Sequence, residues 1–162
     1  MARSHHGSGP PGADREAMLV TEDVQPPVGI VVVSHAAELA DATVALVRQL
    51  ANLDDAGPRL IAAGGLEDGS VGTDALRIAH AIDRADAGGG VVVIADLGSA
   101  ILSAFTAIEE LIASDARVAV SGGPLVEGTF VAAVQASAGD SLEGVRAAAD
   151  DAAAMDKLGD RR

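Results

Sequence analysis

The stretch VGIVVVSHAAELA, residues 28–40, passes from a run of branched apolar residues directly into a serine and a histidine. Its first six residues are typical of a buried strand, because Val and Ile favour extended backbone and no polar residue interrupts them. A helix is predicted to follow over residues 36–52. The apolar stripe of that helix consists of Leu39, Thr43, Leu46 and Leu50. His35 therefore stands where a predicted buried strand ends.

The alternation of strand and helix continues along the chain. Further strands are predicted over residues 58–63, 89–96 and 116–123, and further helices over residues 74–86, 100–113, 129–138 and 141–156. Strands alternating with helices favour right-handed crossovers and a mainly parallel sheet with helices on both faces. We therefore expect a three-layer α-β-α domain over residues 28–156. A disordered arm rich in Gly, Pro and Ser is predicted over residues 1–27 and a short tail over residues 157–162.

Small polar side chains mark the predicted starts of three helices. Thr73 and Ser99 are predicted N-caps, and Asp140, with Glu143 three residues later, resembles a capping box. His80 lies beside two arginines on one helical face, so we expect it to be solvated.

Composition excludes several classes of function. The 162 residues include no Cys, Trp or Tyr and carry a formal net charge of −13. No nucleic-acid partner is expected, because phosphate neutralisation needs clustered Lys and Arg. No membrane partner is expected either, because no apolar run approaches the roughly 20 residues that span a bilayer. The absence of cysteine and of a secretory h-region is typical of a cytoplasmic protein.

In parallel sheets of this kind, ligands bind beyond the carboxyl ends of the strands, where the strand order reverses. If that reversal falls between the first and third strands, His35 and Asp96 face one another across the crevice. Asp96 could then hold one imidazole nitrogen and leave the other free to attack a phosphoryl group. Gly72–Thr73 and Gly98–Ser99 each open a helix, and helix N-termini suit phosphate charge.

Other interpretations of these residues remain open at this point. His35 could be a turn residue bonded to a backbone carbonyl, and Asp96 could simply cap the helix that follows it. A response-regulator receiver would need an acidic pair in place of Ser34 and His35, and a lysine near its last strand, whereas the single lysine is Lys157. Hydrolase, dinucleotide and P-loop motifs are absent, and one His with one Asp is too little for a metal site.

Five segments of the chain together resemble the mannose-type enzyme IIA family of the sugar phosphotransferase system. They are VGIVVVSHAAELA (28–40), IAAGG (61–65), GTDALRIAHAI (72–82), VVVIADLGSAILSAFTAIEEL (91–111) and PLVEGTFVAAVQASAG (124–139). The motifs GTD, DLGSA and PLVEGT are similar to those of the dihydroxyacetone kinase branch of that family. The resemblance implies a sheet in the order 2-1-3-4 with an added antiparallel edge strand, and a homodimer.

The resemblance also implies a chemistry. His35 would accept a phosphoryl group at Nε2 from the phosphocarrier HPr and pass it to ADP on a separate kinase subunit, with Asp96 orienting the imidazole. No cofactor or metal is expected on this chain, whereas ADP or ATP with Mg is expected on the partner. The residues that would line the phosphate site are Ser34, Gly65, Gly72, Thr73, Leu97, Gly98 and Ser99. Candidate partner contacts are Pro124, Leu125 and Glu127.

Two alternatives to that function are carried forward. The first is an enzyme IIA that serves a mannose-type sugar permease, which differs only in its phosphoryl acceptor. The second is a non-enzymatic sensor or binding module in which His35 is never phosphorylated.

Overall fold

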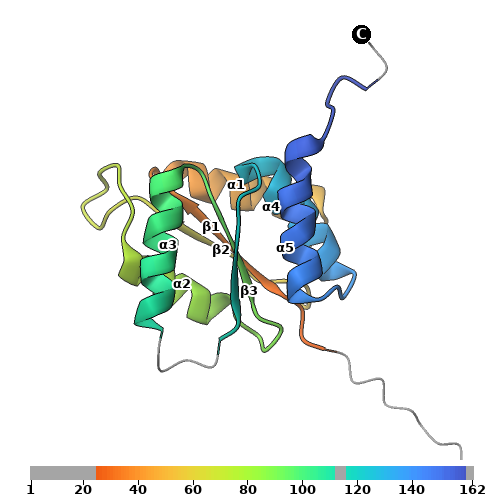
Figure 1. Cartoon of the computed structure of the whole chain (residues 1–162), viewed down its shortest axis with the longest axis horizontal. Helices are drawn as coiled ribbons and strands as arrows, with labels where there is room; N and C mark the ends of the chain where they lie inside the picture. The colour runs from red at the N-terminus through yellow and green to blue at the C-terminus, as the bar shows by residue number, and fades with distance from the viewer. Residues whose placement is uncertain (1–24, 112–115, 160–162) are drawn as a thin grey trace, which may run out of the picture.

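A computed structural model describes residues 25–111 and 116–159 of the chain (Figure 1). Most of the predicted arm over residues 1–27, and the last residues of the predicted tail, lie outside the described residues. The elements, in chain order, are β1 (Gly29–Ser34), α1 (Ala37–Leu50), β2 (Leu60–Gly64), α2 (Ala75–Ala85), β3 (Val91–Ala95), α3 (Gly98–Glu110), β4 (Val118–Ser121), α4 (Leu125–Ser137), α5 (Leu142–Asp151) and the 3₁₀ turn η1 (Ala152–Ala154).

The four strands form one parallel sheet in the order β2-β1-β3-β4, which confirms the predicted order. Within the described residues this sheet has no antiparallel edge strand, so β4 is one of its edges. Residues 129–137 belong to α4, close to the helix that the sequence predicts, and are not available as a strand.

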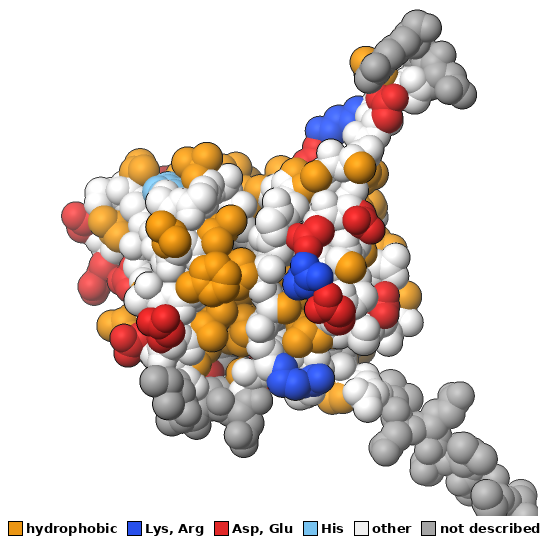
Figure 2. Space-filling model, viewed as in Figure 1, with side chains coloured by type: hydrophobic (Ala, Val, Ile, Leu, Met, Phe, Trp, Pro, Cys, Tyr) orange, Lys and Arg blue, Asp and Glu red, His pale blue; other side chains and the backbone are white. Residues whose placement is uncertain are grey.

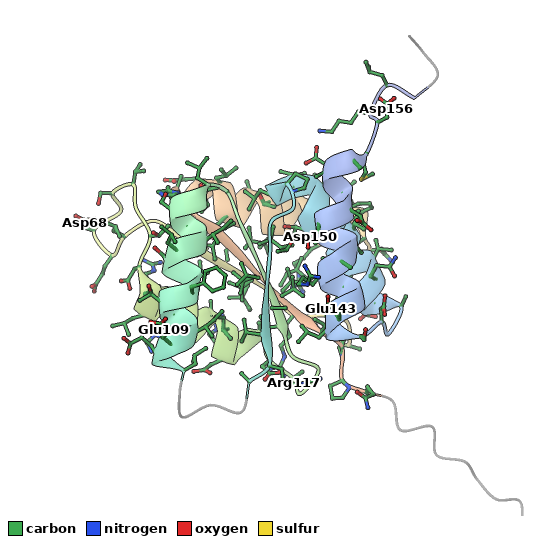
Figure 3. All side chains as sticks on the ribbon, in the orientation of Figure 1. Asp68, Glu109, Arg117, Glu143, Asp150 and Asp156 are labelled. Carbon is green, nitrogen blue, oxygen red and sulfur yellow. The ribbon has the colours of Figure 1, made fainter. Side chains whose placement is uncertain are left out.

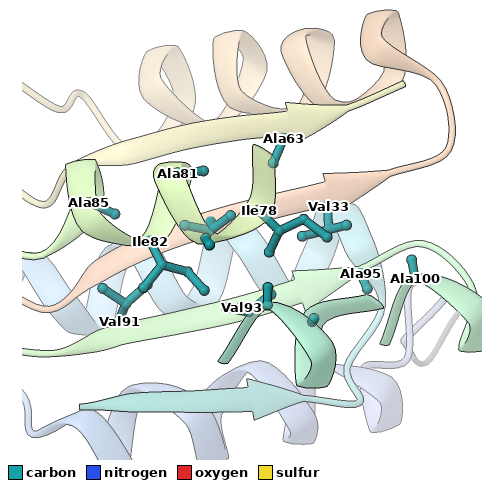
Figure 4. Packing of buried hydrophobic residues seen from close by; sticks show 14 residues of the cluster. Val33, Ala63, Ile78, Ala81, Ile82, Ala85, Val91, Val93, Ala95 and Ala100 are labelled. Atoms are coloured by element: carbon teal, nitrogen blue, oxygen red, sulfur yellow. The ribbon is translucent and has the colours of Figure 1, made fainter. Parts of the chain in front are cut away.

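Helices cover both faces of the sheet, as expected from the alternation of elements (Figure 1). Alternate residues of β1 and β3 point to opposite faces. Val31 and Val33 pack with α2 and α3, whereas Ile30 and Val32 pack with α1, α4 and α5. Figure 4 shows the first of these two clusters, in which small alanines let α2 and α3 approach the sheet closely.

The predicted apolar stripe of α1 is wrong for its three leucines. Leu39, Leu46 and Leu50 are exposed, and the buried residues of this helix are Ala40, Thr43 and Val47. The stripe is displaced by one position because α1 packs on the sheet and on α4 through its smaller side chains. Only Thr43 was placed on the correct face.

Three predicted helix starts also differ from the structure. The N-cap of α2 is Asp74, whose carboxylate accepts hydrogen bonds from two backbone N–H groups, and not Thr73. Ser141 caps α5 in place of Asp140. Leu97 occupies the N-cap position of α3, so Ser99 lies inside the first turn. The helix predicted over residues 129–138 also begins earlier in the structure, because α4 starts at Leu125, directly after Pro124.

No helix within the described ranges is both long and apolar enough to cross a membrane.

Candidate functional site

The carboxyl ends of β1 and β3 lie side by side, because these two strands pair and Val33 is in register with Ala95. The strand order reverses between them, since β2 follows outward from β1 and β4 outward from β3. The residues that come directly after them, His35 and Asp96, are therefore brought together at the predicted switch point. Their contact is direct, with His35 Nδ1 2.9 Å from Asp96 Oδ1.

Asp96 accepts hydrogen bonds at both carboxylate oxygens. Oδ2 accepts from the Ser34 hydroxyl and from the His35 backbone N–H, each at 2.9 Å. Oδ1 accepts from the Leu97 backbone N–H at 2.7 Å in addition to its contact with the imidazole. An ionised carboxylate is only an acceptor, so His35 Nδ1 must carry the proton. The other ring nitrogen, Nε2, then holds a lone pair.

The environment of Asp96 favours that ionised form. Burial by itself raises the pKa of this carboxyl. The hydrogen bonds from the His35 backbone, the imidazole and the Ser34 hydroxyl, together with the electrostatic attraction between the carboxylate and His35, outweigh burial and hold the pKa of Asp96 below its ordinary value. Asp96 is thus a fixed anion beside the imidazole.

Ser99 lies on the other side of the imidazole. Its hydroxyl is 2.9 Å from His35 Nε2, and it donates this hydrogen bond because Nε2 carries a lone pair. Ser99 and Gly98 form the first turn of α3, where backbone N–H groups lack intrahelical partners and the helix dipole is positive. The nucleophilic nitrogen therefore faces a hydroxyl and a helix N-terminus.

The loop between β2 and α2 packs against the residue that bears the imidazole. Gly65 N–H donates to the Ser34 carbonyl at 3.1 Å, and Gly72 N–H donates to the His35 carbonyl at 2.9 Å. Gly65 has a φ of +66°, a conformation that glycine adopts without strain. These contacts fix the backbone on both sides of the β1 end.

Thr73 is linked to this site through a residue that the sequence analysis missed. Its hydroxyl is 2.7 Å from the Ser103 hydroxyl, and Ser103 Oγ lies 3.3 Å from the carbonyl of Ser99. Ser103 stands four residues after Ser99 and hence on the same face of α3. This four-residue spacing is the feature of the sequence that could have indicated Ser103 as a site residue.

The three candidate partner-contact residues lie at the start of α4, beyond the end of β4. Pro124 holds the N-cap position, and Leu125 and Glu127 form the first turn. Glu127 forms an ion pair with Lys157 of the tail. Its carboxylate is not among the described hydrogen-bond partners of His35 or Asp96. They border the same end of the sheet without entering the hydrogen-bond chain at His35.

The imidazole lies at the surface, with 22% of the His35 side chain exposed. A cavity of about 400 Å³ lies at the opposite end of the sheet, lined by residues such as Pro27, Asn52 and Gly139. In the described parts of the chain, no three His, Asp or Glu side chains are grouped so that they could hold a metal ion. The arrangement therefore offers an oriented, accessible nitrogen nucleophile.

Comparison with known proteins identifies the family of the chain. The EIIA-man family, described as the PTS system fructose IIA component, matches residues 29–146. A relative from Escherichia coli (strain K12), named PEP-dependent dihydroxyacetone kinase, phosphoryl donor subunit DhaM, is 39% identical over 114 residues. That match covers 68% of this chain and 24% of the relative, so the chain spans about a quarter of that protein's length.

Shorter proteins match over most of their length. PEP-dependent dihydroxyacetone kinase 2, phosphoryl donor subunit DhaM of Listeria innocua is 36% identical over 113 residues, which cover 67% of this chain and 86% of that protein. The crystal structure of the unknown function protein EF1359 superposes with a TM-score of 0.64 at 31% identity, covering 77% of this chain and 94% of that one. The chain therefore belongs to the mannose-type enzyme IIA (EIIA-man) family, with relatives in its dihydroxyacetone kinase branch.

Proposed function

We propose that this chain is the phosphoryl-transfer subunit of a PEP-dependent dihydroxyacetone kinase, with His35 as the residue that carries the phosphoryl group. The observation that supports this most strongly is the hydrogen-bond chain from Asp96 through the His35 ring to Ser99. The relatives are named phosphoryl donor subunits of dihydroxyacetone kinase, and their names supply the substrate class.

The geometry suits an in-line transfer. The Nε2 lone pair attacks phosphorus as the bond to the donor nitrogen breaks, and the donor keeps that electron pair. The His35 ring gains positive character, which the Asp96 anion stabilises while Nδ1 keeps its proton. Ser99 loses its acceptor at Nε2, so its hydroxyl becomes free to donate to a phosphoryl oxygen. Catalysis then comes from positioning and electrostatics.

Other groups at this end of the sheet would stabilise the negative charge of the phosphoryl group. The backbone N–H groups of Gly98 and Ser99 lie in the first turn of α3. Thr73 is more distant from His35 and is linked to α3 through the Ser103 hydroxyl. Among the described residues that contact His35 or Asp96, none is Lys or Arg. A phosphohistidine without a cation keeps its tendency to transfer the group onward.

The donor would be the phosphocarrier HPr and the acceptor would be ADP, held with Mg on a separate kinase subunit, all in the cytoplasm. Both partners must reach the same exposed imidazole. Leu97, which directly follows Asp96, has 62% of its surface exposed. Pro124 and Leu125, at the start of α4 and at the same end of the sheet, would add apolar surface for a partner.

The test is phosphorylation with PEP, enzyme I and HPr, followed by measurement of acid-labile, alkali-stable phosphate on this chain. Wild type should become labelled and His35→Ala should not. His80→Ala is the matched control, because His80 is an exposed histidine on α2, and it should be labelled like wild type. Labelling that survives in His35→Ala would overturn the assignment, and an unlabelled wild type would favour a binding module.

Addition of ADP-loaded kinase subunit to the labelled protein identifies the acceptor. We expect loss of label with formation of ATP, and then of dihydroxyacetone phosphate when a subunit that binds dihydroxyacetone is also added. Discharge to a mannose-type permease subunit instead would assign the chain to sugar transport.

We further propose a homodimer formed at the β4 edge. Val118 and Val120 of β4 are partly buried, and the neighbouring helix α3 carries the exposed side chains of Leu102 and Phe105. Figure 2 shows hydrophobic side chains gathered between α3 and α5, over this edge. An open strand edge beneath an apolar surface favours pairing with a second chain.

Sedimentation should report twice the mass of one chain for wild type. Phe105→Glu should shift the population toward one chain, whereas Leu50→Glu, an equally exposed apolar position on the other face of the sheet, should not. A wild type that sediments as a single chain at high micromolar concentration contradicts the proposed dimer.

A further inference from the structure

Two strands of the sheet end in the same hydrogen-bond pattern, which we name the serine clamp. At the end of β1, the Ser34 hydroxyl and the His35 backbone N–H both donate to Asp96 Oδ2 at 2.9 Å. The backbone N–H of Ala36 in turn donates to Ser34 Oγ at 3.1 Å. The clamp thus consists of a serine, the two residues after it and one distant carboxylate.

The second serine clamp lies at the end of β4. The Ser121 hydroxyl donates to Asp150 Oδ1 at 2.6 Å, and the Gly122 backbone N–H donates to the same oxygen at 2.8 Å. Gly123 N–H donates to Ser121 Oγ at 3.1 Å. Figure 3 labels Asp150 on α5, the helix that packs beside β4. Gly122 therefore takes the position that His35 holds in the first clamp.

The two clamps differ in what the second carboxylate oxygen does. Asp96 Oδ1 faces the imidazole Nδ1, whereas Asp150 Oδ2 pairs with the Arg146 guanidinium. Ser34 and Ser121 are both fully buried, so each hydroxyl is committed to its clamp. The pattern is thus a general device for fixing a carboxylate at a strand end, and only the clamp at β1 aims that carboxylate at a histidine.

We infer that Ser34 is a positioning residue for the phosphorylated histidine, acting through Asp96. Its hydroxyl holds Oδ2, and this fixes the carboxylate so that Oδ1 meets Nδ1 and the Nε2 lone pair stays free. The Ser34 proton is donated to Asp96 and its oxygen accepts from Ala36, so the hydroxyl has no proton left for a phosphoryl oxygen. This role rests on the proposed function and replaces direct contact with phosphate.

The second clamp provides a matched control for the structural part of this role. Ser34→Ala and Ser121→Ala each remove one buried hydroxyl from a serine clamp. Each variant keeps the backbone N–H that donates to the carboxylate and takes the acceptor from one other backbone N–H. A purely structural contribution should lower thermal stability similarly in both variants. Only Ser34→Ala should change the imidazole, because Asp150 contacts no histidine among the described hydrogen bonds.

The primary readout is the imidazole tautomer of unphosphorylated His35, measured from the ¹⁵N shifts of its two ring nitrogens above pH 8. We expect the Nδ1–H tautomer in wild type and Ser121→Ala, and a mixture with Nε2–H in Ser34→Ala. The rate of phosphorylation by HPr should fall about tenfold in Ser34→Ala alone, the size usual for loss of a supporting hydrogen bond. Ser34→Cys has a side chain of similar volume that is a weak hydrogen-bond donor. Its rate of phosphorylation should lie between those of wild type and Ser34→Ala.

Identical tautomer populations in wild type, Ser34→Ala and Ser121→Ala would overturn the inference. If Ser34→Ala does not fold, Ser34→Cys decides by the same two measurements. A protein that shows the tautomer shift but is not labelled by HPr would retain the positioning role and refute the proposed function. The two failures are therefore distinguishable.

Discussion

At the scale of single residues, the two carboxylate oxygens of Asp96 have different hydrogen-bond partners. Replacement of the carboxylate by an amide, in Asp96→Asn, therefore tests the role of this residue. Oδ2 receives two donors, from Ser34 and the His35 backbone. With the Asp96→Asn carbonyl turned toward those two donors, the NH₂ group faces the imidazole, and the Leu97 N–H loses its acceptor. Nδ1 then becomes the acceptor, Nε2 takes the proton, and no lone pair remains for attack.

We therefore expect Asp96→Asn to slow phosphorylation roughly 10²–10⁴-fold, the effect of a wrong tautomer in a comparable Asp–His pair. Asp96→Ala leaves Nε2 partly unprotonated and should be no slower than Asp96→Asn. The tautomer is measured from the ¹⁵N shifts and the rate by rapid quench. Near-normal transfer in Asp96→Asn would show that Asp96 does not set the tautomer.

The lowered pKa of Asp96 also predicts an acid-dependent contribution to stability. Burial opposes this shift, but the hydrogen bonds that Asp96 accepts from His35 and Ser34 exceed it. A carboxyl whose pKa is lower in the folded chain stabilises the fold above its unfolded pKa of about 3.9, and that stability is lost as the pH falls through the folded value.

Urea unfolding should therefore show wild type more stable than Asp96→Ala at pH 5, with a gap that shrinks at pH 4 and again at pH 3. Asp83→Ala, at an exposed position on α2, serves as the control and should show no such trend. A gap that widens in acid would contradict the sign of this pKa shift.

His35 and Asp96 could be predicted from the sequence because each directly follows an apolar strand, and strand ends converge at one edge of a parallel sheet. The roles of the hydroxyls could not be predicted in the same way. Ser34 reaches Asp96 only because β1 pairs with β3, and Ser103 reaches Thr73 only because α2 packs beside α3, although its four-residue spacing from Ser99 indicates a shared helix face. The contact of Ser99 with Nε2 depends on the same arrangement.

At the scale of elements, α5 closes directly over the loop that leaves β4. A Cβ at Gly123 would lie 1.9 Å from the Ala149 carbonyl oxygen, an atom of the α5 backbone that cannot move alone. Gly123→Ala should therefore destabilise the fold by about 3 kcal/mol, the upper range for overpacking. Urea unfolding measures the loss.

The neighbouring glycine is the matched control. A Cβ at Gly122 meets no atom within 4 Å, so Gly122→Ala should leave the free energy of unfolding nearly unchanged. Equal stability of the two variants would mean that α5 is not held against the loop after β4.

The strands and most helices could be predicted because their apolar runs and periodicities are local. The first residue of a helix is harder to predict, because adjacent polar residues compete for the N-cap position. Thr73 and Asp74 both suit an N-cap, and the carboxylate wins while the threonine hydroxyl turns to Ser103. The inward face of α1 was misplaced because close packing selects Ala40 and Val47 over the larger leucines.

At the scale of the whole molecule, alternation of elements predicts a parallel sheet covered on both sides but does not order its strands. The order 2-1-3-4 followed from the family resemblance, and the structure confirms it. Strand order depends on which hydrophobic faces meet, and every strand of this chain is similarly apolar. The edge at β4 is likewise a property of the assembled sheet.

The net charge of −13 predicts how the proposed donor approaches. An acidic protein attracts a basic docking face over several ångströms, and salt weakens this attraction by shortening the Debye length from about 10 Å at 0.1 M to about 3 Å at 1 M. The second-order rate of phosphorylation by HPr should therefore fall about tenfold over that range, while the rate at saturating donor stays nearly constant.

Reversal of one negative charge near His35 should also lower the second-order rate of phosphorylation by HPr. Glu67 is exposed on the loop whose Gly72 N–H bonds the His35 carbonyl, whereas Glu109 is exposed at the far end of α3 (Figure 3). Glu67→Lys should lower the second-order rate about threefold at low salt, and Glu109→Lys, with the same change of net charge, should lower it less. Stopped-flow measurements at 50 mM and 500 mM salt separate the two. Equal effects of both variants would mean that net charge alone attracts the donor, without a docking face beside His35.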